Sequence, residues 1–138
     1  MAVIEIRRVK AQLEDRQKRK DDRRLRAAGA TLVANASDVE DDVYQVKNQS
    51  GQDPLNFPIR VNNRLANLLS MAERGDGRPT TNMPEIFGIL SQELKGYTDR
   101  LQLVWRNDLA AVNKELARLG LPPLDPKCTT VTGCAPLP

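Results

Sequence analysis

The chain contains no histidine and only two cysteines, and aromatic residues make up 4% of it. Without histidine, neither a Ser-His-Asp nor a Cys-His catalytic arrangement can be built. Two cysteines alone also fall short of the four ligands of a usual structural zinc site. Neither a phosphate-binding glycine-rich loop nor the spacing of an EF-hand occurs. The sequence therefore predicts no metal, no cofactor and no enzymatic activity of this chain's own.

Long apolar runs are also missing. No stretch approaches the roughly 18 consecutive apolar residues that a membrane-spanning helix requires, so we expect no membrane span. The first residues, MAVIEIRRVKAQLEDR, carry acids early and lack the apolar segment of a signal peptide. We expect no export signal within this chain.

What the chain does contain is aliphatic residues at helical spacing. With 138 residues it has room for one core, and with so few aromatics that core must be built from Leu, Val, Ile and Ala. A first stripe, Ile6, Val9 and Leu13, predicts a helix over residues 2–20. Asp21 or Asp22 is expected to cap the next helix.

The second helix is predicted over residues 24–48. Its apolar stripe is the clearest in the chain and comprises Leu25, Ala28, Leu32, Ala36, Val39, Val43 and Val46. Gly29 interrupts this helix, which suggests a close crossing with a neighbour. Asn48, Ser50 and Gly51 are expected to end it.

Two further helices follow a proline-containing linker at residues 51–58. The third is predicted over residues 58–74, on the stripe Val61, Leu65, Leu68 and Ala72, which Leu69 and Met71 widen. The last is expected to start at an Asn82 cap and to run for over thirty residues to Gly120. The predicted fold is an all-α, antiparallel three- or four-helix bundle over residues 1–123, with a long last helix and an extended proline-rich tail over residues 124–138.

Charge is unevenly distributed. Residues 1–26 hold ten Lys and Arg against five Asp and Glu. A basic arm can attract nucleic acid, but the interleaved acids weaken the field that phosphate binding needs, and helical spacing scatters the cations. We therefore interpret this region as a solvated helix face and expect no nucleic-acid partner.

A few polar and aromatic residues remain as candidate binding positions. Asn62 and Asn63 are poor helix formers next to an apolar stripe, and with Arg60 and Arg64 they form a candidate polar pocket. The alternative is that the two amides anchor the linker at residues 51–58. Trp105 is either a partner-binding anchor or a core residue.

The two cysteines, Cys128 and Cys134, lie six residues apart in the tail. They are a candidate disulfide if the tail meets an oxidising compartment. Two free thiols are the alternative.

The run SGQDPLNFPIRVNNRLANLLSMAERGDGRPT, residues 50–80, resembles the C-terminal helical region of bacterial sortilin-like, neuraminidase-repeat β-propeller proteins, which carry a glycosyl hydrolase label. A looser similarity extends over residues 3–123. In that family the label belongs to a propeller of Asp-box repeats, and no such repeat occurs here. The resemblance implies a helical module from an exported parent, not an activity.

Two functions follow as expectations. The first is a non-catalytic structural or interaction module that packs on a β-propeller domain or self-associates, and it predicts an exposed apolar strip on the last helix. The alternative is an accessory part of a glycoside-acting enzyme, in which residues 51–64 help to shape a carbohydrate-binding edge.

Overall fold

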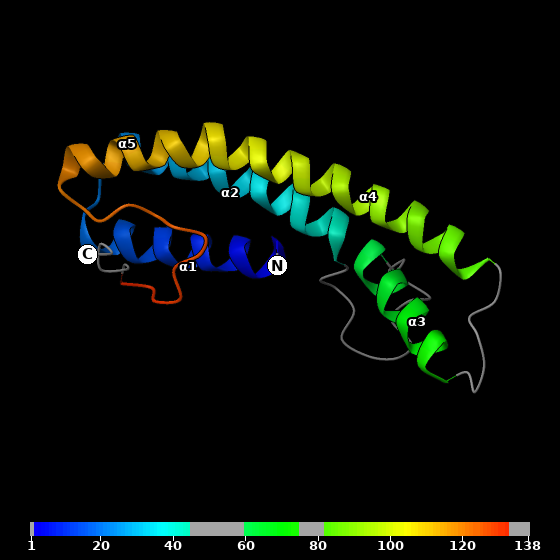
Figure 1. Ribbon diagram of the computed structural model, residues 1–138. Helices are drawn as coiled ribbons and strands as arrows, with labels where there is room; N and C mark the ends of the chain where they lie inside the picture. Colours follow the sequence, from blue (N-terminus) through cyan, green and yellow to red (C-terminus); the bar gives the residue numbers. More distant parts are fainter. Residues whose placement is uncertain (1, 45–59, 75–81, 133–138) are drawn as a thin grey trace, which may run out of the picture. The chain divides into compact units, whose positions relative to one another are not determined.

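The computed structural model describes residues 2–44, 60–74 and 82–132. In these ranges the chain is all-α and contains no strand. The elements are α1 (Ala2–Arg19), α2 (Arg23–Val43), α3 (Val61–Arg74), and a continuous last helix made of α4 (Met83–Val104), a π-helical turn η2 (Trp105–Leu109) and α5 (Ala110–Leu119) (Figure 1). The all-α prediction and the long last helix are confirmed.

The predicted helix ends are mostly close to those observed. The largest difference is in α2, which ends at Val43 instead of near residue 48, since Tyr44 is no longer helical. The linker at residues 51–58, with its predicted role for the two asparagines, lies outside the described residues.

The chain divides into two compact units. Unit 1 comprises residues 1–40 and 100–138, and unit 2 comprises residues 41–99. The sequence predicts a bundle over residues 1–123 and a separate tail, whereas in the structure the described part of that tail belongs to the same unit as α1 and α5.

In unit 1, α1 and α2 form an antiparallel hairpin. Asp22 caps α2, because its Oδ1 accepts hydrogen bonds from the backbone N–H of Arg24 at 2.9 Å and of Leu25 at 3.0 Å. Gly29 lies against α1, where an added Cβ would come within 3.0 Å of Leu13 Cδ2. The expected close crossing at Gly29 is therefore confirmed.

The core of unit 1 is formed by α1, α2, the end of the last helix and the chain that follows it. Its buried cluster consists of Val9, Leu13, Leu25, Leu32, Leu109, Val112, Leu116 and Leu124. Helix α5 runs antiparallel to α2, since Arg118 bonds Asp22 before the start of α2 and Asp108 bonds Asn35 within it. Gly120 ends α5 at a φ of 72°, and the Leu121 N–H bonds the Leu116 carbonyl at 2.9 Å.

Unit 2 is built differently, with few buried residues among those described. Within residues 41–44, 60–74 and 82–99, the buried apolar residues are Val43, Val61 and Leu90. Helices α3 and α4 run antiparallel, because Arg64 pairs with Glu93 while Met71, further along α3, faces the same groove as Met83 at the start of α4. This pair of helices exposes more large apolar side chains than it buries.

Candidate functional site

The first turns of α4 carry an exposed apolar strip. Ile86, Phe87 and Ile89 are 44%, 57% and 62% exposed, whereas Leu90 turns inward and is 5% exposed. Consecutive residues point in directions about 100° apart on a helix, so apolar residues at 86, 87, 89 and 90 surround most of it. One side of this helix, with Leu90, packs within unit 2, and the side with Phe87 is exposed. The exposed strip expected on the last helix is therefore present.

Helix α3 contributes a matching surface. Leu65 and Leu68 are half-buried, while Leu69 and Met71 are each 60% exposed. The sequence VNNRLANLLSMAER places apolar residues on more than one side of this helix. An apolar stripe of this width is typical of a helix with contacts on two sides.

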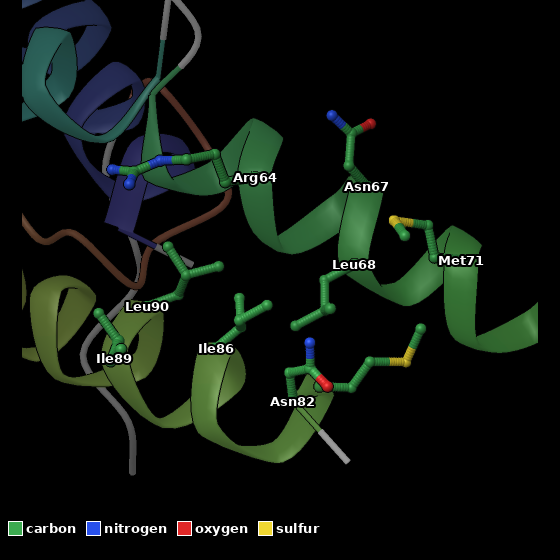
Figure 2. Close-up of a pocket in the computed structure, with 9 residues that line it drawn as sticks. Arg64, Asn67, Leu68, Met71, Asn82, Ile86, Ile89 and Leu90 are labelled. Atoms are coloured by element: carbon green, nitrogen blue, oxygen red, sulfur yellow. The ribbon is translucent and has the colours of Figure 1, made fainter. Parts of the chain in front are cut away.

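Between the two helices lies a groove of about 460 Å³, which we call the α3–α4 groove. Figure 2 shows Leu68 of α3 and Ile86 of α4 pointing toward each other between the helices. Six of the nine lining residues are apolar, and they are Leu68, Met71, Met83, Ile86, Ile89 and Leu90. The other three are Arg64, Asn67 and Asn82. Methionines adapt their shape to a ligand easily, which suits a binding surface.

One polar cluster stands at the edge of this groove. Arg64 Nη2 donates to Glu93 Oε1 at 2.7 Å, and the Tyr97 hydroxyl donates to the same oxygen at 3.2 Å. Burial, followed by the bond to Glu93 and the charge of Asp42, raises the pKa of Tyr97. The ion pair is partly exposed, so it contributes little stability, but it fixes the direction of the Arg64 side chain.

The predicted polar pocket is only partly assembled. Arg60 immediately precedes α3, and Asn62, Asn63 and Arg64 lie in its first turn. Among them only Arg64 lines the α3–α4 groove. Asn62 is exposed, while the Asn63 side-chain oxygen is buried without a hydrogen-bond partner.

Trp105 belongs to unit 1, whereas the four residues at the start of α3 belong to unit 2. It is half-buried in the π-helical turn and packs against the core cluster of that unit. Its indole Nε1 is buried and has no hydrogen-bond partner. Of the two roles considered for Trp105, the packing favours the core residue.

The remaining sequence predictions concern the cysteines, metals and the membrane. Cys128 is buried and its sulfur takes part in a disulfide, whereas Cys134 lies outside the described residues. Within the described ranges, no three metal-ligating side chains gather in one place. No helix found there is both long enough and apolar enough to cross a bilayer.

Sequence reasoning did not identify the groove itself. Leu69 and Met71 were recognised as widening the α3 stripe, but which of these residues would face α4 depends on how the helices pair. The apolar cluster at residues 86–90, which lies on several sides of one helix, is the sequence signal from which a second contact surface could have been predicted.

Comparisons with known proteins return no match for this chain. No family model, no curated protein and no solved structure matches it.

Proposed function

We propose that this chain is a non-catalytic helical interaction module that binds a second copy of itself through the α3–α4 groove and the exposed residues beside it. The observation that carries the proposal is the exposed apolar set on unit 2. It consists of Leu69, Met71, Ile86, Phe87 and Ile89.

The choice of occupant rests on the build of unit 2. A single pair of antiparallel helices can bury only the faces that the two helices turn toward each other. Two such pairs packed face to face form a four-helix bundle, in which the outer apolar residues become core. In a two-fold symmetric contact the same patch serves both partners, so Phe87 and Ile89 of each copy meet the apolar face of the other.

The lining chemistry supports binding of apolar side chains. The groove offers aliphatic and thioether surface, with polar groups confined to Arg64, Asn67 and Asn82. A mainly apolar centre with few polar groups around it is typical of helix-binding surfaces.

The carbohydrate-binding alternative has less support. It relies on Arg60, Asn62, Asn63 and Arg64, of which Arg64 is held by Glu93 and only Arg64 reaches the groove. The packing partner that the resemblance suggests, a β-propeller domain, remains the main alternative occupant of the same surface.

Light scattering of the purified chain tests the proposal. We expect twice the chain mass of 15.4 kDa, and we expect Ile89→Glu to give a helical monomer. The matched control is Leu103→Glu, because Leu103 is 53% exposed on the same helix but lies outside the groove and in unit 1. This control should remain dimeric.

Two outcomes contradict the proposal. A wild-type chain that is monomeric at all concentrations excludes self-association and leaves a different protein as the occupant. If Leu103→Glu dissociates the dimer and Ile89→Glu does not, the contact between the two copies lies outside the α3–α4 groove.

A further inference from the structure

The chain after α5 is held along unit 1 mainly through its own backbone. We call residues 121–132 the C-terminal segment. Gln12 of α1 is 1% exposed, and its side-chain amide makes three bonds to this segment. Nε2 donates to the Asp125 carbonyl at 3.0 Å and to the Cys128 carbonyl at 3.3 Å, while Oε1 accepts from the Asp125 N–H at 2.9 Å.

Arg16 binds the segment in the same manner, one turn further along α1. Its side chain is fully buried. Nε donates to the Pro122 carbonyl at 3.0 Å, and Nη1 donates to the Val131 carbonyl at 2.8 Å. Asp15, paired with the same guanidinium, partly offsets its charge. Nη2 is buried and has no hydrogen-bond partner, so the segment does not satisfy every donor that the site offers.

Helix α5 supplies a third side chain of this kind. Asn113 Oδ1 accepts from the Leu124 N–H at 2.7 Å, and its Nδ2 donates to the Leu124 carbonyl at 3.1 Å. Together the three polar side chains contact the backbone of five residues. A backbone-directed contact does not depend on which side chain the bound residue carries.

Only two side chains of the segment are deeply buried. Leu124 is 3% exposed and Cys128 is 2% exposed, and a turn closed by the Cys128 N–H on the Asp125 carbonyl at 3.1 Å separates them. Three side chains between and beside these two buried residues are exposed, namely Pro123, Asp125 and Lys127. This division resembles peptide recognition in general, where backbone bonds supply affinity and pockets for alternate side chains supply specificity.

We infer that Gln12, Arg16 and Asn113 form a peptide-binding site on α1 and α5, which the chain's own C-terminal segment occupies. Its ligand class is a proline-containing peptide with a leucine and, four residues later, a disulfide-bonded cysteine. While tethered, the segment has a high effective concentration, so an external peptide binds only after the segment is displaced. The site lies in unit 1 and is independent of the α3–α4 groove.

The inference is tested on the full chain with a protease cleavage sequence inserted between Gly120 and Leu121. After folding and cleavage, we expect the segment to remain bound and to exchange with a fluorescent, oxidised peptide of residues 121–138. Anisotropy measures the exchange. The single tryptophan, Trp105, reports on it as well, because it packs against the cluster that contains Leu124.

Peptide variants separate specific recognition from nonspecific attachment. Leu124→Ala in the peptide should weaken binding roughly 30-fold or more, because it empties a buried position. Lys127→Ala, at an exposed position nearby, should change binding by less than about threefold. Equal effects of the two substitutions on binding would overturn the inference. A cleaved chain that stays helical and binds no peptide would overturn it as well.

A second measurement covers the case in which the insertion itself disturbs folding. In the unmodified chain the amides of Leu124 and Asp125 should be protected from hydrogen exchange. Gln12→Ala should reduce protection at Asp125 more than at Leu124, whose partner is Asn113. Unprotected amides at both positions in the unmodified chain would also overturn the inference.

Discussion

Two glycines in the interior of helices have opposite surroundings. A Cβ at Gly29 would lie 2.8 Å from Gln17 Nε2 and 3.0 Å from Leu13 Cδ2, whereas no described neighbour lies within 4 Å of a Cβ at Gly96. Glycine weakens any helix relative to alanine, by up to about 1 kcal/mol. Gly29 is therefore explained by the crossing of α1 and α2, and nothing among the described residues explains Gly96 in this way.

The same substitution should have opposite effects at these positions. Gly29→Ala gains helix propensity but crowds the buried Leu13, and we expect the free energy of unfolding to fall by about 1 kcal/mol. Gly96→Ala should raise it by about 0.5–1 kcal/mol. Chemical denaturation monitored by circular dichroism measures both. A stabilised Gly29→Ala chain would contradict the close crossing.

Glu40 is a single residue that connects α1 and α2. It accepts hydrogen bonds from Arg7 Nε and Lys10 Nζ, each at 2.7 Å. Burial raises the pKa of the Glu40 carboxyl, but the bonds from Lys10 and Arg7 outweigh it, so the pKa lies below its ordinary value of 4.5. The bond from the Leu25 amide, followed by that from Arg118, likewise lowers the pKa of Asp22 below 3.8.

These shifts predict a loss of stability in acid. A carboxylate whose pKa is lowered in the folded state contributes its full stabilisation of the fold at pH values above its unfolded pKa. This contribution is lost as the pH falls through the folded pKa. We therefore expect the denaturation midpoint to drop between about pH 5 and about pH 3. Glu40→Gln should cost about 2 kcal/mol at neutral pH and flatten this dependence. An unchanged slope in the Glu40→Gln chain would show that Glu40 is not responsible.

At the scale of elements, the π-helical turn Trp105–Leu109 determines the register of the last helix. A regular helix continuing from the buried Leu101 would bring Asp108 to the core side, at a spacing of seven residues. In the structure Leu109 is buried there, and Asp108 instead accepts a hydrogen bond from Asn35. The wider turn thus accommodates one extra residue before Val112 and Leu116 resume the stripe.

A deletion within this turn should therefore be tolerated. Removing Asn107, which is exposed, leaves a regular helix in which Leu101, Leu109, Val112 and Leu116 still share one face. We expect unchanged helicity and a change in unfolding free energy within about 1 kcal/mol.

Ala111 is the matched control, because it is exposed but lies in the regular helix α5. Its deletion rotates Val112 and Leu116 relative to Leu109 and should cost several times more. Thermal denaturation monitored by circular dichroism compares the two. If the Asn107 deletion is as damaging as the Ala111 deletion, the π-helical turn does not act as a one-residue insertion.

For the whole molecule, the two units differ in how much they bury. The core cluster of unit 1 alone has eight buried residues, while the described part of unit 2 has only Val43, Val61 and Leu90. Regions with few buried apolar residues open more often than the rest of a protein. Unit 2 should therefore be the less stable of the two when it is not bound to a partner.

Amide hydrogen exchange followed by mass spectrometry tests this difference. At low protein concentration, peptides from α3 should exchange faster than those from α1 and α5. Raising the concentration should slow exchange in α3 if a second copy covers the groove, because binding stabilises the bound form. Equal exchange of α3 and α5 in the monomer would contradict the predicted order of stability.

Sequence alone determined the helices, the stripes that form the core of unit 1, a cap at Asp21 or Asp22 and the end at Gly120, and the structure selects Asp22 as the cap. These features depend on local spacing and on residues with strong positional preferences. It did not predict the burial of Gln12 and Arg16, because two polar residues on α1 resemble a solvated face until a distant segment covers them. It also did not identify Leu109 as a core residue, because a regular helix continuing from Leu101 brings Asp108 to that spacing and the extra residue of a π-helical turn has no local sequence mark.

Tertiary structure alone decided which apolar residues remain exposed. The sequence does not distinguish which apolar residues at the start of α4 enter the core. Of Ile86, Phe87, Ile89 and Leu90, only Leu90 is buried. The physical reason is that a helix is apolar toward whatever packs on it, and periodicity does not distinguish a neighbour within the chain from one outside it. Only the pairing of α3 with α4 reveals which side is already covered and which side is left for a partner.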